Sequence, residues 1–168
     1  MLSYNIFSEN IYDDWEIDEK KYIDIAKKIL KFYLSLEDVY KKSCLQDYDY
    51  DTISFDFLFC SSRKTHEINI EYRNKDYPAD IITFAIFADS EDKFVFDGEI
   101  NLGEVIIALD KVIEESIKKD VTKEYELAFL ISHGILHLLG FDHQTEEDYN
   151  FVIDLQNKAL ESIGYDKI

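Results

Sequence analysis

The sequence of 168 residues is long enough to form one domain with a sizeable hydrophobic core, and 46% of its residues are hydrophobic. Its 36 aspartates and glutamates outnumber the 18 lysines and arginines, so that the formal net charge at pH 7 is -18. This charge excludes indiscriminate binding of nucleic acid, which depends on neutralising phosphates, and any surface that binds a polyanion must therefore be local.

Features of the whole chain predict a single domain, residues 1–168, with an N-terminal helical part at 1–50. No apolar run reaches the length that a membrane span needs, and we expect no membrane partner. The segment 1–15 is acidic and aromatic, whereas a secretory signal is basic and then apolar. Cys44 and Cys60 form no CxxC motif and imply no disulfide framework. These features predict a cytoplasmic protein.

The first half of the chain predicts two helices and one strand. Apolar side chains near helical spacing predict a long amphipathic helix over residues 18–43, and an acidic loop follows at 46–51. Isoleucine and phenylalanine alternate with other residues over 53–59, as they do in a strand. A short helix is expected after Thr65, and Pro78 then breaks the chain.

The second half predicts more strands and then helices. An apolar run rich in strand-forming residues predicts a strand buried on both faces at 80–87. Two more strands are expected at 94–96 and 102–109. Helices are expected at 110–119, from Thr122 to about Leu139, and at 145–163. An early helix, four strands and late helices indicate an α+β domain in which one sheet is covered by helices.

Three histidines close together predict a metal site at the end of the helix that contains HxxxH. His133 and His137 are four residues apart and would share one helix face. Gly140 follows where a helix ends in a left-handed residue, so the chain can turn back and bring His143 over the other two. Three imidazoles leave a fourth position open, as in catalytic zinc sites. We expect one Zn²⁺ per chain, although nickel, copper or iron would also accept these ligands.

The residue directly after the first histidine argues against a standard metalloprotease. In the protease motif HExxH, a glutamate after the first histidine is the general base, and here that position is Gly134. The sequence alone supports two roles for Gly134 equally. It admits close packing of the helix against another element, or it admits substrate to the helix.

Two charged residues are candidates for chemistry on a phosphodiester. Arg73 could stabilise the transition state, because arginine is permanently charged and binds phosphate through two hydrogen bonds. Its ordinary alternative is a surface ion pair. Asp142, next to His143, could orient a ligand imidazole or take part in proton transfer, and an aspartate that stabilises the turn is an equal alternative.

Three motifs resemble the YbeY family of metal-dependent endoribonucleases, the rRNA maturation factors. The first is His133-Gly134-x-x-His137-Leu138-x-Gly140-Phe141-Asp142-His143. The second runs from Asn69-x-x-Tyr72-Arg73-x-x-Asp76-x-Pro78 to Phe84, and the third is Leu102-Gly103-Glu104-Val105-Ile106-Ile107. The resemblance covers about 52–164. Three departures are Ala79 for the family's threonine, Thr83 for serine and Phe141 for tyrosine.

The resemblance implies an α+β fold with a small mixed sheet and a zinc-type ion held by His133, His137 and His143. It implies that Arg73 lies in the catalytic cleft and acts on the phosphodiester. The activity that it implies is cleavage of single-stranded RNA in 16S rRNA 3′-end maturation and ribosome quality control. Because the chain is strongly acidic, docking on a basic ribosomal protein of the 30S subunit could supply the attraction that RNA does not.

Two alternatives stay open beside the endoribonuclease. One is a metallohydrolase that acts on another substrate, such as a peptide, an amide or a small phosphoester. The other is a ribosome assembly factor without catalysis, in which the metal mainly stabilises the fold. Substitution of Arg73 separates the enzyme from the assembly factor, because only the enzyme should lose its role while it stays folded.

Overall fold

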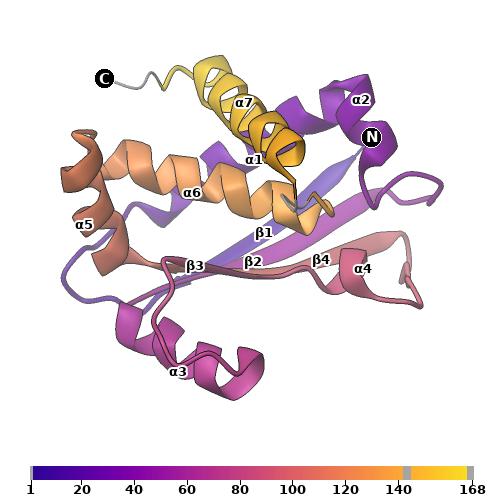
Figure 1. The fold of residues 1–168 in the computed structure, drawn as a ribbon. Helices are drawn as coiled ribbons and strands as arrows, with labels where there is room; N and C mark the ends of the chain where they lie inside the picture. The colour runs from indigo at the N-terminus through magenta and orange to yellow at the C-terminus, as the bar shows by residue number, and fades with distance from the viewer. Residues whose placement is uncertain (1, 142–144, 166–168) are drawn as a thin grey trace.

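A computed structural model describes residues 2–141 and 145–165 of the chain. These residues form four strands and seven helices (Figure 1). In chain order they are β1 (Ser3–Asn10), α1 (Glu19–Ser35), α2 (Glu37–Lys42), β2 (Thr52–Cys60), α3 (Ser62–Arg73), β3 (Ile81–Phe84), α4 (Ile86–Asp89), β4 (Glu99–Ala108), α5 (Leu109–Lys119), α6 (Lys123–Leu138) and α7 (Glu146–Ser162).

The strands form one mixed sheet in the order β1-β2-β4-β3. β1, β2 and β4 are parallel, and β3 runs antiparallel to β4 at the edge. This arrangement confirms the predicted α+β class with a small mixed four-stranded sheet. The set of strands differs from the predicted set, because the N-terminal segment contributes β1 and residues 94–96 do not form a strand.

β1 is an edge strand that the sequence analysis missed. It pairs along its whole length with β2, from Ser3 opposite Thr52 to Asn10 opposite Phe59. Only Ile6 of this strand is buried, because one face and one edge of β1 are exposed. A strand in which a single residue enters the core has too little apolar periodicity to be recognised in the sequence.

The predicted helix over 18–43 is two helices rather than one. Leu36 has the extended conformation φ -88°, ψ 117°, and it separates α1 from α2. Just before it, the Ser35 hydroxyl donates a 2.6 Å hydrogen bond to the carbonyl of Phe32. Such a bond offers the backbone an alternative to the regular helical pattern. The apolar spacing continues across the break, and the sequence therefore indicated one helix.

The strand predicted at 80–87 is shorter and less buried than expected. β3 ends at Phe84, and only Ile82 within it is buried, since the strand lies at an edge. The chain then turns into the short helix α4 beside Gly103 of β4. Gly103 has φ +129°, and a Cβ there would overlap the carbonyl oxygen of Phe84. Close passage of the two backbones therefore requires glycine and accompanies the end of the strand pairing.

The segment 94–96 also differs from the predicted strand. It contributes one isolated bridge, between Phe96 and Glu99. Both Phe94 and Phe96 are 71% exposed, so this segment lies on the surface rather than in the sheet.

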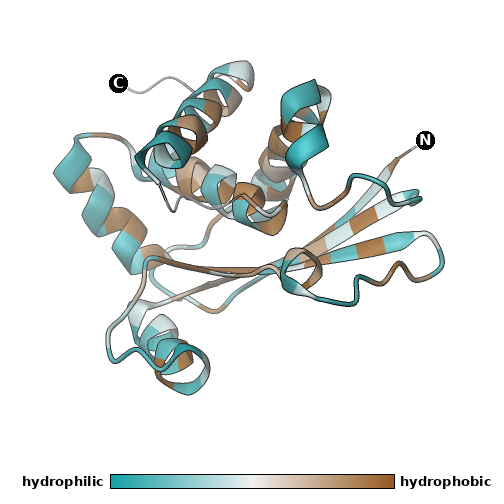
Figure 2. Cartoon of the chain, turned by 45° about the vertical axis from the view of Figure 1, so that its right-hand side comes forward, coloured by the Kyte–Doolittle hydropathy of each residue, from teal (hydrophilic) through white to brown (hydrophobic). Residues whose placement is uncertain are grey.

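The helices form two unequal layers around the sheet. Figure 1 shows α1, α6 and α7 on one face and α3 on the other. Apolar and polar bands alternate along the strands, and α3 is mostly hydrophilic (Figure 2). The main core therefore lies between the sheet and the α1–α6–α7 layer. Within it, the buried Tyr33 hydroxyl of α1 donates a 3.2 Å hydrogen bond to the carbonyl of Ser132 in α6.

In the described ranges, 2–141 and 145–165, no helix is both long and apolar enough to span a bilayer.

Candidate active site

The first two predicted ligands lie side by side on α6. Thr122 caps this helix, as predicted, because its hydroxyl accepts a 3.0 Å hydrogen bond from the backbone N–H of Tyr125. The rings of His133 and His137 are 4.5 Å apart between centroids. Both side chains are half-buried, and the Nε2 atom of His137 is shielded from solvent. One helix thus holds two imidazoles together at the edge of the core.

The end of α6 turns the chain as the glycine predicted. Gly140 has φ +99°, which is the left-handed region that favours glycine. Its N–H donates to the carbonyl of His137 and the N–H of Phe141 donates to the carbonyl of Leu136, both at 3.0 Å. This pair of bonds is the Schellman motif that ends many helices. Asp142 and His143, which come next, lie outside the described residues.

Gly134 lies against the sheet, which favours the packing reading of this glycine. A Cβ at this position would lie 2.8 Å from Cγ1 of Val105 in β4 and 3.3 Å from Cδ1 of Ile81 in β3. The absence of a side chain therefore lets α6 approach β3 and β4 closely. Since His133 precedes Gly134 directly, the same contact fixes the height of the histidines above the sheet.

The end of α6 also contacts α4 and the segment after α2. The N–H of Cys44 donates a 2.8 Å hydrogen bond to the carbonyl of Leu139, and its thiol lies 3.6 Å from the carbonyl of Leu138. Burial raises the pKa of this thiol to about 11. Cys44 is therefore a neutral thiol at pH 7, and its hydrogen bonds to Leu138 and Leu139 stabilise the turn.

Arg73 occupies a different part of the fold. It is the exposed last residue of α3, and its Nη1 donates a 3.2 Å hydrogen bond to Oδ1 of the buried Asn69. Asn69 in turn donates a 2.8 Å hydrogen bond to the carbonyl of Tyr77. Figure 1 shows α3 and α6 on opposite faces of the sheet. The described contacts do not bring Arg73 together with the histidines, and its place in a common cleft stays a prediction.

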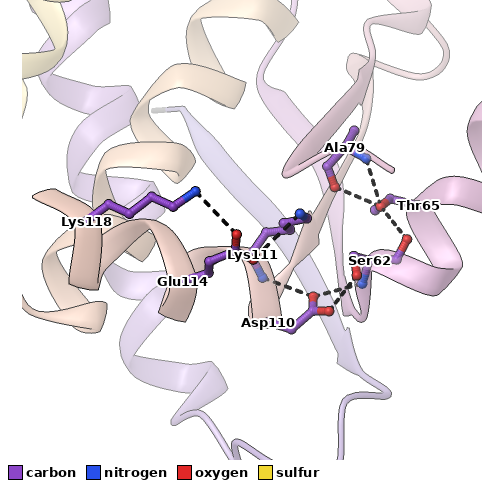
Figure 3. A network of polar contacts seen from close by, with 7 residues as sticks. All are labelled: Ser62, Thr65, Ala79, Asp110, Lys111, Glu114 and Lys118. Carbon is purple, nitrogen blue, oxygen red and sulfur yellow. Dashed lines mark hydrogen bonds and ion pairs between the residues drawn. The ribbon is translucent and has the colours of Figure 1, made fainter. Parts of the chain in front are cut away.

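The loop that follows Arg73 is held by polar contacts that the sequence analysis did not identify. The N–H of Ala79 donates to the hydroxyl of the buried Thr65 at 3.1 Å, and that hydroxyl donates to the carbonyl of Ala79 at 2.7 Å (Figure 3). Asp110 of α5 accepts two hydrogen bonds from Ser62, the first residue of α3, at 2.8 Å from its N–H and 2.6 Å from its hydroxyl. Both bonds to Thr65 involve the backbone of residue 79 and not its side chain. Alanine can therefore replace the family's threonine at this position without losing them.

A second contact in this region joins α3 to the loop. Nε2 of His66 lies 2.8 Å from Oδ1 of Asp76. His66 is the one histidine outside the HxxxH region, and it carried no sequence signal because its partner is ten residues further along the chain. The motif residues Asn69 and Asp76 thus have structural partners within α3 and the loop that follows it.

The donors present fit the chemistry of a transition metal but do not complete a site. Two neighbouring imidazoles are suitable ligands for zinc. Within residues 2–141 and 145–165, no group of three or more His, Cys, Asp or Glu side chains is placed to hold a metal. The third predicted ligand, His143, lies outside these ranges, so the zinc ion stays a prediction.

Comparison with known proteins identifies the family. Residues 7–164 match the family model described as Endoribonuclease YbeY, and this match begins well before the predicted start at residue 52 and includes the second half of β1. The chain is 33% identical to Endoribonuclease YbeY of Oceanobacillus iheyensis over 94% of this chain and 98% of that protein. It is 32% identical to the protein of the same name from Acetivibrio thermocellus, over 96% and 98% of the two chains.

A solved structure supports the fold independently. The solution structure of TM1509 from Thermotoga maritima superposes with a TM-score of 0.55 and 20% sequence identity, over 95% of this chain and 91% of that one. At this identity the likeness concerns the fold alone. The family match over almost the whole chain, the paired histidines and the glycine turn at the end of α6 agree with one another, and the chain therefore belongs to the YbeY family of endoribonucleases.

Proposed function

We propose that this endoribonuclease cleaves single-stranded RNA with the help of a divalent metal, in the cytoplasm, and acts in 16S rRNA 3′-end maturation and ribosome quality control. The observation that carries the proposal is the pair of imidazoles 4.5 Å apart at the end of α6. The Schellman turn that follows reverses the chain just before His143, the third predicted ligand. The names of the relatives support the reaction class.

In this proposal each residue has a role of its own. His133, His137 and His143 hold the ion, with Zn²⁺ as the first candidate. When bound, such an ion lowers the pKa of water and polarises a phosphoryl oxygen. Arg73 contributes permanent positive charge to the phosphodiester as negative charge develops there. Asp142 would orient a ligand imidazole or take part in proton transfer.

A partner on the 30S subunit is part of the proposal, and an acidic aromatic surface supports it. A hollow of about 640 Å³ is lined by the exposed Phe94 and Phe96, together with Asp92, Asp97 and Glu99. Exposed apolar side chains of this kind mark interaction sites, and the carboxylates favour a basic partner over RNA. A basic ribosomal protein has the matching charge.

The test is cleavage of a labelled single-stranded RNA by metal-loaded wild type, Arg73→Ala and His137→Ala, with metal content and thermal stability recorded for each. Arg63→Ala is the matched control, because Arg63 is the second arginine and is also exposed on α3. We expect wild type and Arg63→Ala to cleave, and a folded Arg73→Ala to lose at least 100-fold in rate, on the order of one lost electrostatic stabiliser.

The other outcomes are equally informative. Equal cleavage by every variant would identify a contaminating ribonuclease and remove support for the proposal. A wild type that binds one metal and cleaves neither free RNA nor RNA in 30S subunits would favour the assembly factor without catalysis. That outcome agrees with the positions of α3 and α6 on opposite faces of the sheet.

A further inference from the structure

A hollow of about 470 Å³ lies beside the histidine helix, where α2, the end of α6 and the start of α7 meet. Its size is within the range of small-ligand sites. Gly140 and Phe141 line it, and they follow the predicted ligand His137 within four residues. A group bound there would therefore lie next to the proposed reaction centre.

Two aromatic rings form one wall of this hollow. The ring centroids of Phe141 and Phe151 are 6.2 Å apart, with an angle of 34° between the planes. Both side chains are half-buried, so part of each ring packs on the core while the side chain lines the hollow. Unstacked bases of single-stranded RNA bind to aromatic rings of this kind.

The negative charges around the hollow favour binding of a base over binding of a phosphate inside it. Glu147 and Asp148 line it, and two carboxylates repel a phosphate group. Carboxylates accept hydrogen bonds from amino groups of bases. Guanine presents an N–H and an amino group side by side, so that one carboxylate accepts from both, whereas uracil presents a single N–H between two carbonyl groups.

One cation lies at the rim. The Nζ of Lys42 is 5.0 Å from the centroid of the Phe151 ring. The preceding Lys41 is paired with Glu37 at 2.8 Å, but no ion pair of Lys42 occurs among the described residues. Its ammonium lies over the ring of Phe151, and a base that stacks on this ring would displace it toward the phosphate of the same nucleotide.

We infer that the hollow lined by Lys42, Phe141, Glu147, Asp148 and Phe151 binds one base of the RNA next to the scissile phosphate, with a preference for guanine over uracil. This inference rests on the proposed function. It assigns Phe151 to stacking, Glu147 and Asp148 to recognition of the base edge, and Lys42 to the phosphate. The hollow thereby positions the strand and biases the sequence at which it is cut.

The experiment is a titration of ¹⁵N-labelled, metal-loaded protein with GMP and UMP, followed by two-dimensional amide NMR spectra. Both nucleotides carry the same phosphate, and inorganic phosphate is titrated separately, so the difference between them reports the base. We expect GMP to shift the amides of residues 140–141 and 147–152, with UMP binding several-fold more weakly. Phe151→Ala should weaken GMP binding about tenfold, within the range for loss of one stacked base.

Matched variants keep the result interpretable. Phe151→Trp should retain binding, since it keeps a stacking surface, and Glu147→Gln with Asp148→Asn should bring GMP and UMP to similar affinity. Phe7→Ala removes a phenylalanine of β1 that is 61% exposed and does not line the hollow, and it should leave binding unchanged. The spectra themselves show whether each variant is folded.

The inference is overturned if GMP shifts no amide around the hollow, if inorganic phosphate gives the same shifts, or if Phe151→Ala binds GMP as wild type does. Cleavage of single-stranded RNA is measured on the same wild-type sample. Cleavage without a nucleotide in the hollow removes this inference and leaves the proposed function intact. Loss of both removes both.

Discussion

Gly134 controls how closely the histidine helix approaches the sheet. Alanine has a higher helix propensity than glycine by up to about 1 kcal/mol, so propensity alone would favour replacing it. Steric overlap opposes this gain, because a Cβ at residue 134 would lie 2.8 and 3.2 Å from the two methyl carbons of Val105. Valine is branched at Cβ and has little rotamer freedom with which to move away. Overlap should therefore outweigh propensity at this residue.

We predict that Gly134→Ala lowers the free energy of unfolding by about 1–3 kcal/mol, the usual cost of overpacking. Urea denaturation measures the change. Val105→Ala makes room for the new methyl group, so the double variant should lose less stability than the sum of the two single variants. An exposed helical control, Glu161→Ala, should stay within about 0.5 kcal/mol of wild type. A Gly134→Ala protein more stable than wild type would contradict the packing role.

At the scale of elements, one buried ion pair joins α5 to α6. Both carboxylate oxygens of Glu126, which is 1% exposed, accept 3.1 Å hydrogen bonds from Nζ of Lys119. Burial raises the pKa of the Glu126 carboxyl, and Lys119 lowers it by less. The carboxylates of Glu115 and Asp80 also face this group and raise its pKa further. The junction before the histidine helix therefore depends on pH.

We predict that Glu126→Gln becomes increasingly stable relative to wild type as the pH rises. A raised pKa means that the folded state binds the proton more tightly than the unfolded state does. The contribution of Glu126 is therefore fully present below its ordinary pKa of 4.5 and is lost as the pH rises through the raised value. Urea unfolding of both proteins between about pH 4 and 8 covers this window.

The control for this prediction is Glu114, whose pKa is shifted in the opposite direction to that of Glu126. Lys118 and Lys111 lower the pKa of the exposed Glu114 on α5. Glu114→Gln should therefore lose stability relative to wild type as the pH rises from below the lowered pKa to above 4.5. Parallel stability curves for Glu126→Gln and wild type would show that the ion pair compensates burial fully.

Elements that depend on local signals could be predicted from the sequence. Elements that depend on tertiary contacts could not. α6 was predicted within a residue or two, because its cap, its apolar length and its glycine end are all local signals. The early end of β3 at Phe84 depends on a neighbour distant in sequence, Gly103, whereas the break at Leu36 is local but leaves the apolar spacing unchanged. The paired histidines were predictable for the same local reason as α6. The placement of α3, which ends at Arg73, on the face of the sheet opposite α6 was not predictable, since it depends on topology.

At the scale of the whole molecule, local positive charge must compensate for a net charge of -18. Several lysines are already paired with carboxylates, as in Lys41–Glu37 and Lys158–Asp154. Arg73 and Lys42 have no such ion pair among the described contacts, although Arg73 donates a hydrogen bond to Asn69. Because Arg73 and Lys42 are the cations of the proposed phosphodiester and base sites, few phosphates are neutralised there, and stacking and docking on a partner must supply the remaining affinity.

This balance predicts a weak salt dependence of RNA binding. Each phosphate neutralised on a single strand contributes about 0.7 to the slope of log affinity against log salt concentration. With one or two contacts, the slope for an unlabelled competitor RNA should be about -1, and Arg73→Ala and Lys42→Ala should each reduce its magnitude by about 0.7. Titrations at several KCl concentrations measure it. A slope near -4 would require about six neutralised phosphates. Arg73 and Lys42 could not account for so many, and a further basic surface would have to bind the RNA. A shallow slope that both substitutions leave unchanged would instead assign the binding to uncharged contacts, with stacking on Phe151 as the first of them to remove.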